Sequence, residues 1–85
     1  MQTIKGKVAL ITGAGRGIGR ATAVAFAREG IHVGLVGRTL ENLQRVAEEL
    51  KQYDVKVAIA MANVSDLDSI TTAVESIRGE LGAID

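Results

Sequence analysis

The sequence has no cysteine and no proline, and its 85 residues include a single histidine. Without cysteine the chain has no disulfide, no thiolate nucleophile and no sulfur ligand for a metal. With His32 as the one imidazole, we expect no metal-binding residues. Aromatic residues make up 2% of the chain, so aliphatic side chains within the 47% hydrophobic content have to build any core.

The chain also lacks an excess of either charge, because ten basic residues balance ten acidic ones. A neutral chain has no strong electrostatic attraction to nucleic acid or to an anionic membrane, so we expect neither partner. The apolar run at residues 8–11 is far too short for a signal sequence or a membrane span. These features favour a soluble, cytoplasmic protein, and 85 residues limit it to one small domain.

Short apolar runs alternate with segments of helical pattern along the chain. The runs at residues 8–12, 32–36 and 55–61 are typical of buried parallel strands. Helices are predicted over residues 17–29 and 40–52, and a third from Leu67 to Leu81 with Ser65 as its N-cap. This order predicts an α/β fold, a Rossmann-like doubly wound parallel sheet with strands in the spatial order 3-2-1.

Each predicted helix carries apolar residues that we expect to face the sheet. They are Ile18, Ala21, Ala25 and Val24 or Phe26 in the first helix, Leu40, Leu43, Val46, Ala47 and Leu50 in the second, and Leu67, Ile70, Val74, Ile77 and Leu81 in the third. Gly30 is expected to end the first helix. The first two helices should cover one face of the sheet and the third the other.

Residues 82–85 have the composition of a helix stop followed by the opening of a fourth strand. We therefore expect residues 1–85 to be a partial dinucleotide-binding domain, truncated after three strands and three helices. In such a domain the first strand presents an unpaired apolar edge, which favours self-association.

A glycine cluster, Thr-Gly-Ala-Gly-Arg-Gly-Ile-Gly at residues 12–19, joins the first strand to the first helix. Glycine allows a tight turn and a close approach of the backbone to a ligand, and the N-terminus of the following helix favours a phosphate. A P-loop requires a second glycine five residues after its first, followed directly by lysine, but Ile18 and Arg20 stand at the two positions where that glycine would be. The spacing is T-G-x-x-x-G-x-G.

This octapeptide, preceded by Lys5, Gly6 and Lys7, resembles the N-terminal signature of the short-chain dehydrogenase/reductase family, and the resemblance covers essentially the whole chain. It implies the cofactor-binding half of such an enzyme, with a small-molecule dinucleotide cofactor held by the cluster. The residues implied are Gly13, Gly15, Arg16, Gly17, Ile18 and Gly19. A glycine-rich turn that serves packing alone is the alternative.

The end of the second predicted strand indicates which cofactor is used. Gly37 stands where NAD-specific members of the family carry aspartate, and Arg38 follows it, as in NADP-specific members. A guanidinium binds a phosphate bidentately, and no carboxylate is present to repel that phosphate. The resemblance therefore implies NADP, with Arg16 as a weaker second basic position. Alternatively, Arg38 is a solvated residue and Thr39 caps the next helix.

Asn63 and Val64 follow the third predicted strand, where the family commonly has Asp-Val for recognition of the adenine amino group. Asparagine keeps an acceptor oxygen. Some 3-oxoacyl-(acyl-carrier-protein) reductases of the family have Asn-Val here, so the pair favours that subgroup. An asparagine that only stabilises a turn is the alternative.

Catalysis in the family uses an Asn-Asn-Ala-Gly segment, a serine, and a tyrosine followed four residues later by lysine. This chain has no Asn-Asn-Ala-Gly segment, and its one tyrosine, Tyr53, has Val57 where the lysine would stand. We expect no catalytic residue in the chain, no activity of the chain alone, and an intact protein that reduces a 3-oxoacyl thioester or similar carbonyl with NADPH. A non-catalytic nucleotide-binding or interaction module complete at Asp85 is the alternative, and an S-adenosylmethionine-binding domain is less favoured.

Overall fold

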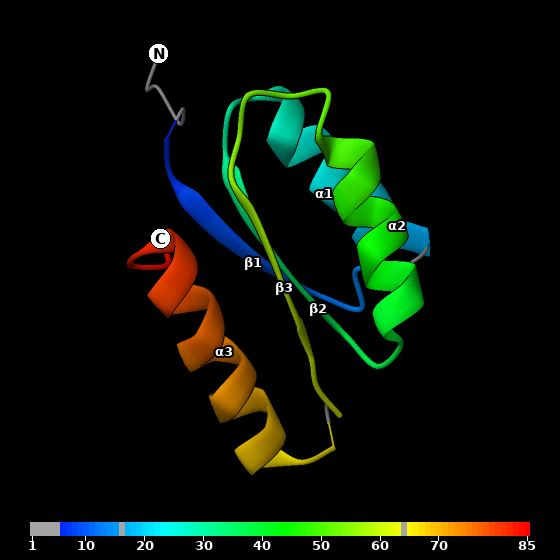
Figure 1. Ribbon diagram of the computed structural model, residues 1–85, viewed down its shortest axis with the longest axis vertical. Coiled ribbons are helices and arrows are strands. Elements are labelled where there is room, and N and C mark those ends of the chain that lie inside the picture. The colour runs from blue at the N-terminus through cyan, green and yellow to red at the C-terminus, as the bar shows by residue number, and fades with distance from the viewer. Residues whose placement is uncertain (1–5, 16, 64) are drawn as a thin grey trace.

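The computed structural model describes residues 6–15, 17–63 and 65–85. In chain order these form β1 (Val8–Thr12), α1 (Gly17–Arg28), β2 (His32–Gly37), α2 (Leu40–Leu50), β3 (Val57–Met61) and α3 (Leu67–Leu81). Figure 1 shows three layers, with α1 and α2 on one face of the sheet and α3 on the other. The predicted alternation of strands and helices, and their division between the two faces, are confirmed.

All three strands are parallel, and β2 lies between β1 and β3. Val8 of β1 lies opposite His32 of β2, and Val33 of β2 lies opposite Val57 of β3. The predicted spatial order is therefore confirmed. Because the strands run in one direction, their carboxyl ends share one edge of the sheet, and the loops that lead to the three helices begin there.

Two apolar layers hold the helices to the sheet, one on each face. The layer under α1 and α2 includes the fully buried Leu35, Leu43 and Leu50, and the layer under α3 includes Val36 and Ile77. Successive side chains of a strand point to opposite faces, so Leu35 and Val36 of β2 serve one layer each. Burial of each such side chain contributes about 1.5–3 kcal/mol, so these contacts supply much of the stability of the fold.

The predicted buried face of α1 is wrong for three of its residues. Ala23 and Ala27 are the buried residues of this helix. Three residues that we expected to face the sheet are exposed, namely Ile18, Ala21 and Ala25. The other two expected residues, Val24 and Phe26, are partly buried. Apolar residues occupy most positions of α1, so their spacing does not determine its rotation, and close packing on the sheet selects the smallest side chains.

The predicted faces of α2 and α3 are confirmed in their middle turns and wrong at their first residues. Leu43, Val46 and Ile77 are buried as expected. Leu40 and Leu67, which begin α2 and α3, are 40% and 75% exposed. α3 starts past the carboxyl end of β3, where no sheet lies beneath its first turn (Figure 1). Leu40 lies almost one turn before Leu43, which already packs at the last residue of β2, Gly37.

The N-cap of α3 is Asp66 and not Ser65. The Asp66 side chain accepts hydrogen bonds from the backbone N–H of Asp68 at 3.0 Å and of Ser69 at 3.4 Å. Asp and Ser are comparably good caps, so composition alone does not choose between neighbours. Gly30 ends α1 as predicted, since its N–H donates to the Ala27 carbonyl of the last turn in a Schellman arrangement.

Two predicted element boundaries move by two residues, while the ends of α1 and β2 move by one. The third strand begins at Val57 instead of residue 55, because the Val55 N–H donates to the Tyr53 carbonyl in a tight turn. The second helix ends at Leu50 instead of residue 52, where the Lys51 N–H bonds back to the Glu48 carbonyl. Local turn hydrogen bonds therefore delay the start of β3 and end α2 early.

The outer edge of β1 is not fully unpaired. The Asp85 N–H donates to the Val8 carbonyl at 2.9 Å, and the Val8 N–H donates to the Asp85 carboxylate at 2.8 Å. The expectation of a free edge is therefore corrected at Val8, because Asp85 returns to the start of β1. Self-association through the rest of this edge remains a prediction.

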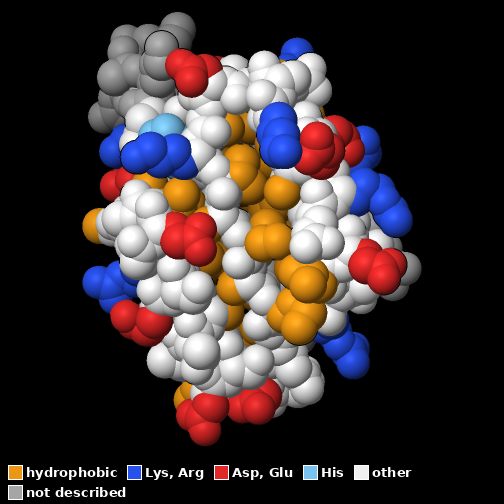
Figure 2. All heavy atoms as spheres, in the orientation of Figure 1, with side chains coloured by type: hydrophobic (Ala, Val, Ile, Leu, Met, Phe, Trp, Pro, Cys, Tyr) orange, Lys and Arg blue, Asp and Glu red, His pale blue; other side chains and the backbone are white. Residues whose placement is uncertain are grey.

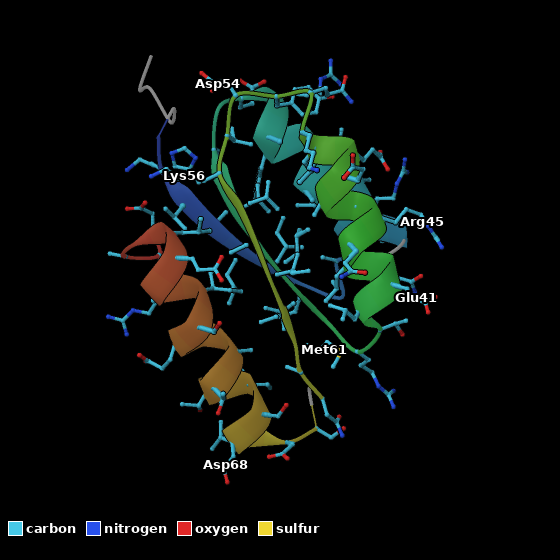
Figure 3. All side chains as sticks on the ribbon, viewed as in Figure 1. Glu41, Arg45, Asp54, Lys56, Met61 and Asp68 are labelled. Atoms are coloured by element: carbon cyan, nitrogen blue, oxygen red, sulfur yellow. The ribbon has the colours of Figure 1, made fainter. Side chains whose placement is uncertain are left out.

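Apolar side chains also gather over β3, between α2 and α3, on the face that Figure 2 shows. Met61, at the end of β3, is 55% exposed (Figure 3). Among the described residues, β3 pairs with β2 alone and so forms an edge of the sheet.

Gly34, at the centre of β2, allows the close approach of α3. A Cβ added there would lie 2.6 Å from Cγ2 of Ile77. We expect Gly34→Ala to lower the free energy of unfolding by roughly 1–3 kcal/mol, because the methyl group forces the packed side chains apart. Denaturant titration followed by circular dichroism measures this change.

Gly79→Ala is the matched control, because a methyl group at this position of α3 meets nothing within 4 Å. It is expected to raise the free energy of unfolding by about 0.5–1 kcal/mol through helix propensity. An unchanged stability of Gly34→Ala would contradict the close packing of α3 on β2.

Candidate functional site

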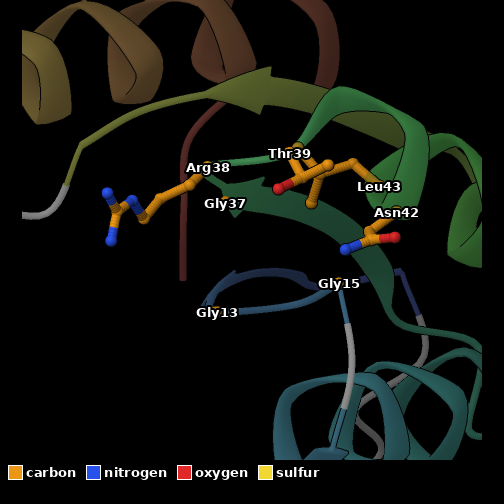
Figure 4. Close-up of a pocket in the computed structure, with 7 residues that line it drawn as sticks. All are labelled: Gly13, Gly15, Gly37, Arg38, Thr39, Asn42 and Leu43. Carbon is orange, nitrogen blue, oxygen red and sulfur yellow. The ribbon is translucent and has the colours of Figure 1, made fainter.

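Two hollows lie at the carboxyl edge of the sheet and share one residue, Arg38. The first has a volume of about 490 Å³ (Figure 4), and its lining residues are Gly13, Gly15, Gly37, Arg38, Thr39, Asn42 and Leu43. The second has a volume of about 310 Å³, and its lining residues are Arg38, Met61, Ala62, Asn63 and Ser69. The loops after all three strands therefore contribute to one continuous region.

The glycine-rich turn forms the floor of the first hollow (Figure 4). Gly13 and Gly17 have φ values of 65° and 64°, which favour glycine, and a Cβ at either would meet open space. Gly19 differs, because its added Cβ would lie 2.2 Å from the Gly13 carbonyl oxygen. The turn is held to β2 by a hydrogen bond from the Ala14 N–H to the Val36 carbonyl at 3.3 Å. Packing thus explains Gly19, whereas Gly13 and Gly17 shape the turn.

Gly37 and Arg38 have different environments although they are adjacent. Gly37 is buried, and a Cβ there would lie 3.0 Å from Cδ2 of Leu43 on α2. Arg38 is exposed, extends from the end of β2 over the opening, and forms no salt bridge with another described residue. Thr39 occupies the N-cap position of α2, but its side chain makes no capping hydrogen bond. No acidic side chain lines the first hollow within the described residues.

Asn63 lines the second hollow and also stabilises the loop after β3. Its side-chain oxygen accepts a hydrogen bond from the backbone N–H of Ser65 at 3.0 Å, and the backbone N–H of Asn63 donates to Ser69 Oγ at 3.0 Å. These contacts agree with the turn-stabilising alternative. A carboxamide oxygen has a second lone pair, and its nitrogen has two donors, so the same side chain retains capacity for a ligand.

The structure brings most of the expected site residues to one edge of the sheet. Ile18 begins α1 and is 86% exposed, so it is available for contact at this edge. Arg16 and Val64 lie outside the described residues. The sequence interpretation did not place Asn42 and Leu43 at the site. The available signal was that both residues belong to the first turn of the predicted helix that follows the second strand, and this turn begins at the carboxyl edge of the sheet.

The side chains of His32 and Tyr53, which could in principle do chemistry, instead make contacts within the fold. His32 Nδ1 accepts a hydrogen bond from the Lys56 N–H at 2.9 Å and so joins β2 to the start of β3. Tyr53 is half-buried against the core layer under α1 and α2. Within the described residues, no group of three or more His, Cys, Asp or Glu side chains is placed to bind a metal. In that same part of the chain, each helix is too short or too polar to cross a membrane.

A family model described as short chain dehydrogenase matches residues 7–85 of the chain. The chain is 43% identical over 82 residues to the glycine betaine reductase ATRR of Emericella nidulans. It is 42% identical over 82 residues to the 3-oxoacyl-(acyl-carrier-protein) reductase FabG of Thermotoga maritima. Each match covers 96% of this chain, but 6% of the first relative and 33% of the second. The chain therefore spans a third or less of the length of these relatives.

Solved structures of similar sequence have the same fold. L-sorbose reductase from Gluconobacter frateurii, complexed with NADPH, matches with a TM-score of 0.91 and 41% identity, over 96% of this chain and 32% of the reductase. Carveol dehydrogenase from Mycobacterium avium, in complex with NAD, matches with a TM-score of 0.91 and 32% identity, over 100% of this chain and 35% of the dehydrogenase. Both nicotinamide cofactors therefore occur among the structural neighbours.

The contact between Gly19 and Gly13 generates a stability prediction. Gly19→Ala is expected to lower the free energy of unfolding by roughly 1–3 kcal/mol or more, because its methyl group overlaps a backbone oxygen. Gly17→Ala, which is strained by its positive φ but meets open space, is expected to cost about 1–2 kcal/mol. Thermal and denaturant unfolding of both variants compares the two costs. A Gly19→Ala variant as stable as the parent chain would contradict the close contact.

Proposed function

We propose that this chain, which belongs to the short-chain dehydrogenase family, forms the NADP(H)-binding portion of an oxidoreductase. The observation that carries the proposal is the first hollow at the carboxyl edge of the sheet. There Arg38 stands over a glycine-rich turn, and the seven lining residues include no carboxylate. A cofactor with an additional phosphate on its ribose requires a cation and the absence of a competing anion.

The residues present fit such a cofactor. The turn containing Gly13, Gly15 and Gly17, with the N-terminus of α1, would hold the pyrophosphate through backbone N–H groups. Arg38 would pair with the 2′-phosphate of the adenosine ribose. The exposed Ile18 would contribute an apolar contact.

Three further residues complete the proposed set. Asn63 lines the second hollow beside Arg38, where it would accept a hydrogen bond from the adenine amino group. Arg16 and Val64 are included on the family resemblance of the sequence, as a second basic group and as a neighbour of the adenine. Because the structural neighbours include both an NADPH and an NAD complex, the choice of NADP for this chain depends on Gly37 and Arg38.

We further propose that the intact protein reduces a 3-oxoacyl thioester or a similar carbonyl, for which bound NADPH supplies the hydride. The Asn63-Val64 pair and the similarity to a 3-oxoacyl-(acyl-carrier-protein) reductase support this choice. The contribution of these 85 residues is to bind and orient the cofactor. The serine, tyrosine and lysine that the family uses in catalysis have no counterpart among them.

Arg38→Ala is expected to weaken NADPH binding by about ten- to 150-fold while changing NADH binding little, because a charge-assisted hydrogen bond contributes about 1.5–3 kcal/mol. Titration of the nucleotide fluorescence measures both affinities. Arg45→Ala is the control, because it removes the same charge from the outer side of α2, outside both hollows (Figure 3). Equal affinities of the parent chain for NADPH and NADH would contradict the proposed preference.

The 85-residue chain mixed with NADPH and a 3-oxoacyl thioester is expected to show no NADPH oxidation above the rate without protein. Absorbance at the reduced nicotinamide band follows this reaction, and a short-chain reductase of full length serves as the positive control. Turnover by the chain would mean that its own residues support catalysis, which would overturn the division of roles proposed above.

A further inference from the structure

We propose that Asn42 contacts the phosphorylated ribose directly and contributes, with Arg38, to the discrimination of NADP(H) from NAD(H). This inference rests on the proposed nucleotide-binding function. It assigns a role to a side chain that lies in the first hollow and that the glycine and arginine motifs do not include.

Asn42 is one of three residues with polar side chains among the seven that line the first hollow, with Arg38 and Thr39. Figure 4 shows its carboxamide on the α2 side of the opening, directed toward Gly15, while Arg38 extends from the other side. A Cβ added to Gly15 would lie 2.8 Å from Asn42 Cβ and 3.7 Å from Asn42 Nδ2. Asn42 therefore stands directly over the glycine-rich turn.

Packing determines the position of Asn42. The next residue, Leu43, is fully buried, and together with Val46 and Leu50 it sets the rotation of α2 on the sheet. That rotation turns Asn42 toward the glycine-rich turn, where it is half-buried. Arg38, by contrast, is a long and exposed side chain that loses more conformational freedom when it binds. A short side chain held in advance lowers the entropic cost of recognition.

The chemistry of a carboxamide suits a phosphorylated ribose. Its nitrogen has two donors for phosphate oxygens, its oxygen accepts from a ribose hydroxyl, and the group carries no charge that repels a phosphate. A carboxylate at the same place would lose the donors and repel the 2′-phosphate, yet it would still accept hydrogen bonds from ribose hydroxyls. The identity of residue 42 should therefore affect the two cofactors differently.

The test is Asn42→Asp, which keeps the shape of the side chain and replaces the amide by a carboxylate. We expect NADPH to bind at least about tenfold more weakly, while the affinity for NADH changes less than about threefold. Asn42→Ala, which removes the donors without adding charge, should weaken NADPH binding by a smaller factor. Fluorescence titration of each variant gives the affinities, and circular dichroism verifies that each is folded.

Gln44→Glu is the matched control, because it makes the same change of amide to carboxylate at an exposed position of α2 outside both hollows. If Asn42→Asp and Gln44→Glu weaken NADPH binding equally, the effect is one of net charge and the inference is overturned. It is also overturned if Asn42→Asp weakens NADPH and NADH binding by the same factor.

The two proposals fail in different ways. If the parent chain binds neither nucleotide, or if Arg38→Ala changes nothing, the proposed function itself fails. If the parent chain prefers NADPH and Arg38→Ala removes that preference, but Asn42→Asp does not change it, only the role of Asn42 is refuted.

Discussion

The site depends on the contact between the first turn of α1 and the loop that follows β1. At Gly19 the helix comes so close to the Gly13 carbonyl that a methyl group there would lie 2.2 Å from the oxygen. This contact brings the N-terminus of α1 to the end of β1, while the positive φ of Gly13 and Gly17 lets the chain reverse there. The turn is thus compact on the side of the helix and open on the side of the hollow. An open backbone at a helix N-terminus is the feature that phosphate recognition requires.

The packing around this turn explains how the rest of the sheet supports it. α1 and α2 lie on the same face, and Arg20 of α1 donates two hydrogen bonds to the Glu49 carboxylate of α2, at 2.9 and 2.5 Å. An exposed pair of this kind contributes less than about 1 kcal/mol, so the buried layer, and not the ion pair, holds the helices in place. Leu43 belongs to that layer and also lines the hollow, and it contacts the position of Gly37. The core and the candidate site therefore share residues, so a change in the packing of α2 would also change the shape of the hollow.

Much of the fold follows from local sequence. Apolar runs and helical spacing are local properties, and they predict the alternation of strands and helices, while the right-handed crossover rule predicts the strand order. The rotation of α1 was predicted wrongly, because Ile18 and Ala23 are equally compatible with an apolar face until the distance to the sheet is known. The choice of Asp66 over Ser65 as the cap of α3, and the return of Asp85 to Val8, depend on where neighbouring backbone lies.

By itself the sequence determined the family, the glycine-rich turn, and the presence of Arg38 without a carboxylate at residue 37. These features are visible because each depends on the type of residue at a fixed spacing along the chain. Only the tertiary structure placed Asn42 over Gly15 and gave Arg38 a position between two hollows. The physical reason is that such positions result from the packing of α2 and α3 on the sheet. Side chains from separate helices and strands decide that packing together, and spacing along the chain does not encode their contacts.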